Sequence, residues 1–335
     1  MRSTVLIRRW VLMCSALLSL NLHGQPQLPV PEIFGPGVIS GPGNDGAPTF
    51  SPDGKTLYFT RSAAHWTAIV ESHVVNGQWS KPTLAPFSGE WPDSSPAMSP
   101  DGTYIVFQTT RPMTPLKEAP KPGEPIPGVV SNLWRVDRTG SGWTAPVRLP
   151  DTVNIGRSIW KPSIAADGTI YFTNIDDKGG KRLYSSRLVH GSYETAQPLP
   201  FSDGTKADVD PEIAPDGSFL VFCSSGRLSD DSKDHLFIVR RSGSGWGEVE
   251  RIRYEGDEKP YGSSTDDEPR LGPDHRTLYF SSDRAVVVHF PRTREQAEKD
   301  LERVDGWDNS NNNVWSIPLT PLLSSAGGNE ANAAS

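Results

Sequence analysis

Acidic side chains recur at matching places along this chain. It contains five similar segments, each with a proline near its start, and in four of them an aspartate stands three residues before that proline. In chain order the five positions are Asp45, Asp93, Ile159, Asp208 and Asp266. Four carboxylates that meet at one axis would repel one another unless a cation or a basic side chain neutralised them, and a ring of oxygen atoms suits Ca²⁺ or Mg²⁺. Asp45, Asp93, Asp208 and Asp266 are therefore candidate Ca²⁺ ligands, although hydrogen bonding of each aspartate to backbone N–H groups is the favoured interpretation.

Basic side chains follow the same segments. Arginine comes just after four of the five, and the third is followed by Asn174 and Asp176; the arginines are Arg61, Arg111, Arg227 and Arg284. An arginine and an aspartate in each unit predict ion pairs between neighbouring units, each contributing about 0.2–1 kcal/mol if exposed. The alternative is that the forked guanidinium groups bind anionic sugars or a carboxylate-bearing peptide.

Aromatic side chains lie close to these charged positions in the sequence. They are His65, Trp66, Trp91 and Trp160. Such rings can stack on a sugar, but tryptophan also packs between neighbouring sheets, and packing is the favoured interpretation.

Linear catalytic motifs are missing from the sequence. It contains no Gly-x-Ser-x-Gly, no His-Glu-x-x-His, no Walker loop and no cysteine pair at zinc-binding spacing. The sequence therefore names no reaction and no catalytic residue.

The elements that must position these side chains are the five segments themselves. They span residues 47–59, 95–107, 161–172, 210–222 and 268–280, and the first reads Ala-Pro-Thr-Phe-Ser-Pro-Asp-Gly-Lys-Thr-Leu-Tyr-Phe. In each, an apolar stretch meets a Pro-Asp-Gly type of turn, and a β-branched and aromatic stretch follows. Repetition at this period indicates one supersecondary unit packed against copies of itself.

The sequence of each unit predicts four antiparallel strands. Second strands are expected at 56–60, 104–109, 169–173, 219–224 and 277–281, and third strands at 68–75, 132–137, 182–188, 235–240 and 313–319. A glycine-containing hairpin turn and an outer strand follow in the first four units. The 31 Gly and 31 Pro suit short strands and tight turns. The predicted fold class is all-β, a β-propeller of four-stranded antiparallel blades.

The repeat count predicts five blades, with six as the alternative if one unit has gone unrecognised. The fifth unit ends after its third strand. Residues 31–39 resemble the outer strands of the other units, so this N-terminal strand is predicted to complete the last blade and close the ring.

The Ser-Pro-Asp-Gly-Lys-x-Leu-Tyr-Phe signature at residues 51–59 resembles the WD-like propeller repeats of the TolB family, and the resemblance covers about residues 31–323. TolB proteins are periplasmic propellers of the bacterial envelope that also carry an N-terminal α/β domain. We expect that domain to be lacking here, because only a few residues separate the predicted cleavage site from the first strand. The resemblance implies an exported binding platform.

The N-terminus predicts export. Residues 1–24 read as a signal peptide, in which arginines precede an apolar run at 10–20 that is shorter than the about 20 residues of a membrane-spanning helix. We therefore expect a periplasmic or extracellular protein without a transmembrane span. Residues 25–323 would form the propeller and 324–335 a disordered tail. Lipid attachment at Cys14 stays open, and Cys223 has no partner for an internal disulfide.

Chain direction in such blades places all long loops on one face. These are residues 61–67, 111–131, 174–181, 225–234 and 284–312, the last containing a predicted short helix at 292–304 that would lie on the ring. The first interpretation is a non-enzymatic scaffold that binds an envelope or secreted protein or peptide through this face. Its candidate binding residues are His65, Trp66, Trp91, Asp93, Arg111, Trp160, Asp208, Arg227, Asp266 and Arg284.

The alternative is a carbohydrate-binding protein or a carbohydrate-active enzyme, a polysaccharide lyase or glycosidase, that uses Asp, Arg and His side chains at the channel mouth. Nucleic acid is excluded as a partner class by the net charge of −7 and the scattered arginines.

Overall fold

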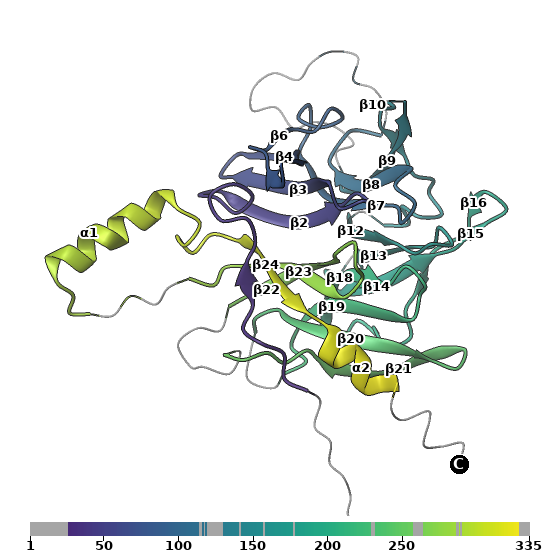
Figure 1. The fold of residues 1–335 in the computed structure, drawn as a ribbon. Helices are drawn as coiled ribbons and strands as arrows, with labels where there is room; N and C mark the ends of the chain where they lie inside the picture. Colours follow the sequence, from purple (N-terminus) through teal and green to yellow (C-terminus); the bar gives the residue numbers. More distant parts are fainter. Residues whose placement is uncertain are drawn as a thin grey trace, which may run out of the picture.

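In a computed structural model, the chain forms five antiparallel β-sheets that follow one another around a central axis (Figure 1). The structure describes residues 26–113, 116, 118, 130–140, 142–156, 158–176, 178–228, 232–256, 264–285, 288 and 290–327. The predicted signal peptide, Cys14 and most of the proline-rich loop at 111–131 lie outside these residues. The prediction of an all-β propeller with five blades is confirmed.

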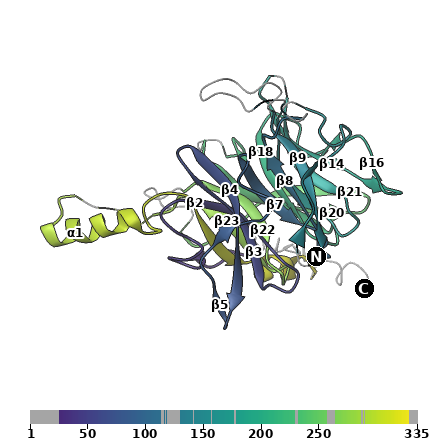
Figure 2. The ribbon, with the colours of Figure 1, turned by 90° about the horizontal axis from the view of Figure 1, so that it is seen from above.

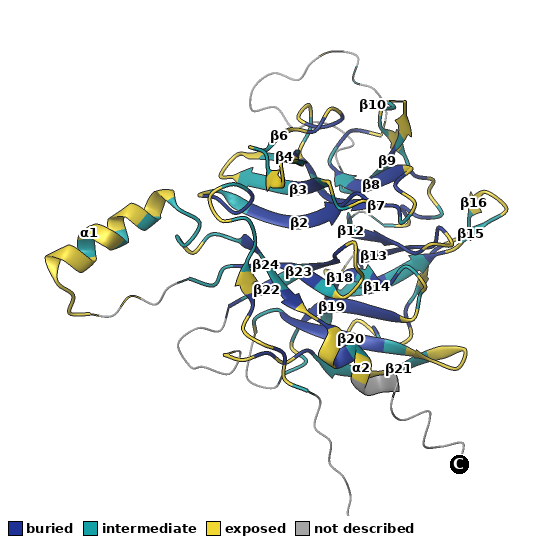
Figure 3. Ribbon diagram, viewed as in Figure 1, coloured by how far each residue is buried: buried dark blue, intermediate teal, exposed yellow. Residues whose placement is uncertain are grey.

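Each blade has four main strands. The innermost strands line the axis and are β2 (Asn44–Phe50), β7 (Asp93–Met98), β12 (Ser158–Ile164), β18 (Ala207–Ile213) and β22 (Asp266–Leu271). The second strands are β3 (Thr56–Ala63), β8 (Tyr104–Thr109), β13 (Ile170–Ile175), β19 (Phe219–Ser225) and β23 (Thr277–Ser282). The third strands are β4 (Trp66–Val75), β9 (Asn132–Thr139), β14 (Lys181–Ser186), β20 (His235–Ser242) and β24 (Asn313–Pro318). Burial decreases from the inner strands to the outer ones (Figure 3).

The outer strands are short in most blades. They are β6 (Thr83–Leu84), β11 (Val147–Arg148), β17 (Gln197–Pro198), β21 (Gly245–Arg251) and β1 (Glu32–Ile33). Short ladders beside the hairpin turns add β5 (Gln78–Trp79), β10 (Gly142–Trp143), β15 (Leu188–Val189) and β16 (Ser192–Tyr193).

The Pro-Asp-Gly turns join the first two strands of a blade. In the first blade the N–H of Gly54 donates to the carbonyl of Ser51 at 2.8 Å, and Gly54 has a φ of +68°. The Asp53 carboxylate accepts from the Ser51 hydroxyl at 2.6 Å, which holds the pKa of Asp53 below its usual value. In the fifth blade His275 takes the place of the glycine, with a φ of +52°. The aspartates of these turns thus stabilise the turn.

The N-terminal segment closes the ring, as predicted. Strand β1 pairs antiparallel with β24, with Glu32 opposite Ser316 and Ile33 opposite Trp315. The next residue, Phe34, donates its N–H to the carbonyl of Val314 at 2.8 Å. Its ring makes an edge contact with Tyr279 at a centroid distance of 4.9 Å and also meets rings of the first blade. One short stretch therefore joins the last blade to the first.

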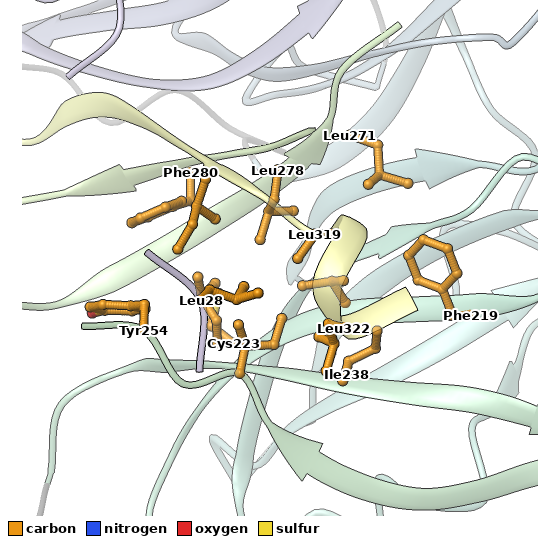
Figure 4. Close-up of a cluster of buried hydrophobic side chains, with 14 of the residues drawn as sticks. Leu28, Phe219, Cys223, Ile238, Tyr254, Leu271, Leu278, Phe280, Leu319 and Leu322 are labelled. Atoms are coloured by element: carbon orange, nitrogen blue, oxygen red, sulfur yellow. The ribbon is translucent and has the colours of Figure 1, made fainter. Parts of the chain in front are cut away.

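Leu28 extends this joint into the fourth blade. Its side chain is 1% exposed and lies in a core cluster with Tyr254, Cys223 and Phe280 (Figure 4). The same cluster contains Leu322 of helix α2 (Thr320–Gly327), which covers the fourth and fifth blades. This helix runs past residue 323 into the segment predicted as a disordered tail.

All five inner strands carry the same bulge. The residue before each repeat proline has a positive φ although none is glycine: Ala47 (+45°), Ser95 (+52°), Lys161 (+52°), Asp210 (+56°) and Glu268 (+51°). A β-bulge of this type leaves one residue unpaired in its own sheet. In three blades its N–H instead donates to a second-strand hydroxyl of the preceding blade: Ser95 to Thr60 at 2.8 Å, Asp210 to Thr173 at 2.9 Å, and Ala47 to Ser281 at 3.3 Å. These bonds, which we call the blade latches, give the bulge N–H of three blades an acceptor in the preceding blade.

We expect Thr60→Val to lower the free energy of unfolding by about 1–3 kcal/mol, because it leaves the buried N–H of Ser95 without an acceptor. Gln108 occupies the equivalent place in the second blade, and within the described residues its Oε1 has no partner. Gln108→Met is therefore the matched control and should change stability by less than about 0.5 kcal/mol. Equal losses in chemical denaturation would refute the latch.

The predicted helix in the fifth loop forms but does not lie on the ring. Helix α1 (Arg294–Glu302) starts with a capping box between Thr293 and Gln296 and continues into a 3₁₀ turn at Arg303–Asp305. None of its residues is buried, and it projects away from the blades in both views (Figures 1 and 2). The prediction was wrong on this point, because the helix has too few apolar residues to cover a sheet.

Candidate functional site

The four aspartates named from the sequence bind arginines of their own blades. The distances are 2.6 Å for Arg61 to Asp45, 2.7 Å for Arg111 to Asp93, 2.6 Å for Arg227 to Asp208, and 2.8 Å for Arg284 to Asp266. All four carboxylates are at most 1% exposed. The predicted ion pairs therefore form, but the prediction that they join neighbouring blades was wrong.

Each arginine also holds the connection that arrives from the preceding blade. Arg61, Arg111 and Arg227 donate to backbone carbonyls at 2.9–3.1 Å, those of Ile39, Phe87 and Phe201 respectively. In the fifth blade Arg284 donates to the Tyr254 hydroxyl at 2.9 Å instead. Burial raises the pKa of Asp45 and Asp93, and the paired arginine opposes this rise. These eight side chains are thus engaged in stabilising the scaffold.

The third blade lacks this pair. Ile159 and Asn174 face each other in its first two strands, and the Oδ1 of Asn174 has no partner among the described residues. Across the residues that the structure describes, no group of three or more His, Cys, Asp or Glu side chains could hold a metal ion. These residues therefore show no set of Ca²⁺ ligands, and Ca²⁺ binding by the four aspartates stays an untested prediction.

The predicted aromatic residues do not form one platform. His65 and Trp66 are exposed near the turn between β3 and β4, Trp91 is half-buried before β7, and Trp160 is half-buried in β12. No ring contact joins any two of them in the described part of the chain. The Trp160 ring carries Lys181 Nζ at 5.8 Å from its centroid, and Trp160 comes directly before Lys161 in β12.

Residues that the sequence analysis did not name carry the charges of the channel. The bulge residues Lys161 and Glu268 form an ion pair, and since they belong to the third and fifth blades, the pair spans the channel. Glu268 also accepts from the Ser281 hydroxyl at 2.6 Å, and its N–H donates to Asp210 Oδ2 at 3.2 Å. The position before the repeat proline reads Ala, Ser, Lys, Asp and Glu along the five units. The change to charged residues at this position in the last three units was the sequence signal that could have identified these channel residues.

Four carboxyl groups lie near the bulges of the fourth and fifth inner strands, and Lys161 and Lys181 are basic groups that act on them. We call Asp210, Asp234, Asp267 and Glu268 the acidic cluster. Burial raises the pKa of Asp267 to about 8, with repulsion from Asp210 and Asp234 adding to the rise and Lys161 opposing it. Burial and the charge of Asp210 also raise the pKa of Asp234. At neutral pH Asp267 therefore keeps its proton.

A second set of channel residues lies toward the Pro-Asp-Gly turns. Arg270 is 2% exposed and donates to the carbonyls of Pro162 (2.9 Å), Pro269 (3.1 Å) and Pro211 (3.5 Å), which belong to three different blades. Its Nη1 lies 3.4 Å from Glu212 Oε2. Below this pair is a cavity of about 160 Å³ lined by residues of all five blades. The sequence analysis assigned binding to the other face and did not foresee it.

Comparison with solved structures supports the fold. No protein-family model and no curated protein matches the sequence. The α-L-arabinofuranosidase PaAbf62A from Podospora anserina, solved with cellotriose, is similar over 87% of this chain and 98% of that one, with a TM-score of 0.50 and 12% identity.

Two TolB structures are also similar. A provisionally assigned TolB from Agrobacterium tumefaciens matches 75% of this chain and 74% of its own, with 21% identity and a TM-score of 0.47. TolB from Acinetobacter baumannii matches 81% of this chain at 15% identity and a TM-score of 0.43, and the match spans about half (53%) of its own length. The predicted resemblance to TolB-like propellers is confirmed at the level of the fold, which is a five-bladed propeller.

Proposed function

We propose that this chain is an exported, non-enzymatic binding propeller that holds a basic segment of a protein or peptide at the long-loop end of its channel. The observation that carries the proposal is the acidic cluster, in which the four carboxyl groups outnumber the two lysines that act on them, Lys161 and Lys181. Lys161 and Glu268 are 19% and 13% exposed, so the cluster is within reach of solvent. Guanidinium and ammonium groups form strong charge-assisted hydrogen bonds with such carboxylates.

Export is part of this proposal and rests on the N-terminal residues 1–24, which lie outside the described part of the chain. Among the described residues, no helix is both long and apolar enough to cross a membrane. Fractionation of cells that express the full chain should recover a protein shortened by about the length of this segment from the periplasm or medium.

Binding of a cation should release a proton. At pH 7 Asp267 is protonated because its pKa is about 8. A bound guanidinium favours the carboxylate and lowers this pKa, so the affinity should rise as the pH increases from about 6 to 9. Calorimetric titration of tetra-arginine in two buffers of different ionisation enthalpy should show the release of up to one proton, and the uncharged analogue tetracitrulline should not bind.

The variant that tests the site is Asp267→Asn. It should weaken tetra-arginine binding about tenfold and abolish proton release, since the amide cannot ionise. Asp151→Asn replaces a carboxyl group that is 87% exposed and outside the acidic cluster, and it should leave binding unchanged. If both variants bind alike, the peptide is attracted only by the net charge and the proposal fails.

The same variant should be more stable than the native protein at high pH. The pKa of Asp267 is higher in the folded state, so its protonated form favours folding; this contribution is full below the unfolded-state pKa of about 4 and is lost as the pH rises from there through about 8. Melting temperatures of Asp267→Asn and the native protein should therefore differ least near pH 4, diverge in favour of the variant as the pH rises, and differ by a constant amount above about pH 8. A divergence of the opposite sign would show that Asp267 is ionised.

A carbohydrate-active enzyme is the second candidate, favoured by one observation. Asp267, with a pKa of about 8, can donate a proton and lies near the carboxyl groups of Asp210 and Glu268, and glycoside hydrolysis requires a pair of carboxyl groups. Trp160 adjoins Lys161 in the sequence. A reducing-sugar assay on a panel of polysaccharides distinguishes the two functions. Turnover that disappears in Asp267→Asn would replace the binding proposal with this one.

A further inference from the structure

Helix α1 belongs to a projecting segment, residues 288 and 290–311, which we call the arm (Figures 1 and 2). Of the eleven large apolar side chains that are exposed in the described part of the chain, four lie on the arm: Val288, Phe290, Leu301 and Val304. An isolated helix of nine residues is too short to be stable in water, and helices in proteins gain most of their stability by packing an apolar face. The arm therefore presents an apolar surface that no other described part of the chain buries.

A cavity of about 410 Å³ lies beside the C-terminal end of α1. Val288 and Val304 supply apolar side chains to its wall, and residues 308–311 form much of the rest. The side chain of Asn311 fixes this wall, since its N–H donates to the carbonyl of Pro42 at 2.7 Å. A dry cavity of about 150 Å³ already holds a benzene molecule, so this one has room for an aromatic side chain.

Phe290 is the most exposed of the apolar side chains on the arm, at 75%. It does not line the cavity, although it belongs to the same arm. The Cζ of Arg292 lies 5.1 Å from the centre of its ring, so the aromatic group has a cation on one side. The arm thus carries both an exposed aromatic side chain and a cavity large enough to hold one.

Charge divides the arm in the same way. Residues 290–294 contain two arginines and no acidic residue, whereas residues 298–308 contain five acidic and two basic residues. The cavity lies in the acidic part, where Asp300 and Asp308 line it and both bind Arg303 at 3.1 Å. One ion pair between the two parts already forms within the chain, from Arg292 to Asp300 at 2.6 Å. The segment that carries Phe290 is therefore electrostatically complementary to the segment that surrounds the cavity.

We propose that two copies of this chain associate through their arms, with Phe290 of each copy in the cavity of the other. Because the aromatic side chain and the cavity belong to the same surface, a two-fold axis makes both contacts at once. The same contact covers Val288 and Val304 and brings the basic segment of each arm to the acidic segment of the other. A second copy is favoured over an anionic lipid surface, because residues 290–308 include six acidic and four basic residues.

Sedimentation velocity of the full chain at about 1–500 µM tests the proposal. We expect a monomer–dimer equilibrium with a Kd of about 10–100 µM, because two small arms bury less than the about 1,600 Å² of a standard interface. Phe290→Ser should weaken the dimer at least about tenfold, since it removes an aromatic side chain from the centre of the contact. Val147→Ser is the matched control: Val147 is 64% exposed on β11, outside the arm, and this variant should dimerise as the native protein does.

A cross-link identifies the contact itself. A mixture of Phe290→Cys and Val304→Cys proteins should form a disulfide-linked pair under mild oxidation. A mixture of Phe290→Cys and Val147→Cys proteins is the control and should not. Cys223, the native cysteine of the described residues, is buried and does not compete.

Three results would overturn the proposal: a monomer at every concentration, a dimer that persists in Phe290→Ser, or the absence of the mixed cross-link. Binding of the monomeric native protein to phosphatidylglycerol vesicles, lost in Phe290→Ser, would identify a lipid surface as the occupant in place of a second copy.

Discussion

Deletion of residues 26–34 should convert the closed ring into an open array that melts far below the intact protein. The deletion removes Leu28, strand β1 and Phe34, and so takes away the only ladder on the outer side of β24 that the described residues provide. Loss of a buried Leu and a packed Phe costs roughly 5–10 kcal/mol together, which is comparable to the whole stability of a domain. The exposed edge of β24 should also promote aggregation.

Leu28→Ala gives a graded version of this experiment. It leaves β1 in place and removes only the side chain that lies in the core of the fourth and fifth blades (Figure 4). We expect a loss of about 2–5 kcal/mol in chemical denaturation. Glu32→Gln, at an exposed position of the same strand, should have little effect. A deletion variant with unchanged melting temperature and a monodisperse profile would contradict closure by this segment.

Replacement of Arg270 by Met should be among the most damaging single substitutions in the chain. Arg270 joins carbonyls of three blades, and its removal leaves Glu212 as a buried carboxylate without its basic neighbour. Breaking a buried ion pair from one side costs about 3–5 kcal/mol. The measurement is the free energy of unfolding from urea denaturation at several pH values.

The pH dependence identifies Glu212 as the cause. Burial already raises the pKa of Glu212 in the native protein, where Arg270 opposes the rise, and without Arg270 it should be higher still. A carboxyl whose pKa is raised on folding favours the folded state when protonated, so the deficit of Arg270→Met should be smallest at low pH and grow as the pH rises. The double variant with Glu212→Gln should recover part of the loss at pH 7. A pH-independent deficit would mean that the lost packing of Arg270 dominates.

The fold could be predicted well from the sequence because the residues of each repeat determine the local structure of that repeat. The Pro-Asp-Gly turns fix the register of the first two strands, and that register would also have predicted the ion pairs within a blade. Asp45 lies opposite Arg61 in the ladder of β2 and β3, so counting back from the turn brings them together. The prediction of ion pairs between neighbouring blades was wrong because it considered only that the Asp and Arg residues lie on the same face of the ring. It did not consider their register within one sheet.

The channel chemistry could not be predicted in the same way. Lys161 and Glu268 are more than a hundred residues apart and meet only because the ring places the third and fifth blades across the channel from each other. The positive φ of the bulge residues also has no local signal, since none of the five is glycine. These features depend on the closed ring and appear only when all five blades are in place.

The blade latches all run in one rotational sense. A hydroxyl on each contributing blade accepts from the blade that follows it, including the step from the fifth blade back to the first. Such a joint is head-to-tail: at the three junctions that have a latch, the earlier blade supplies the hydroxyl and the later blade supplies the N–H. The first blade has both halves, Thr60 and Ala47, so a copy of it would meet the original through the same joint. The geometry of the latch does not itself set the number of blades at five. That number must be set by the rotation that the inner strands impose around the axis.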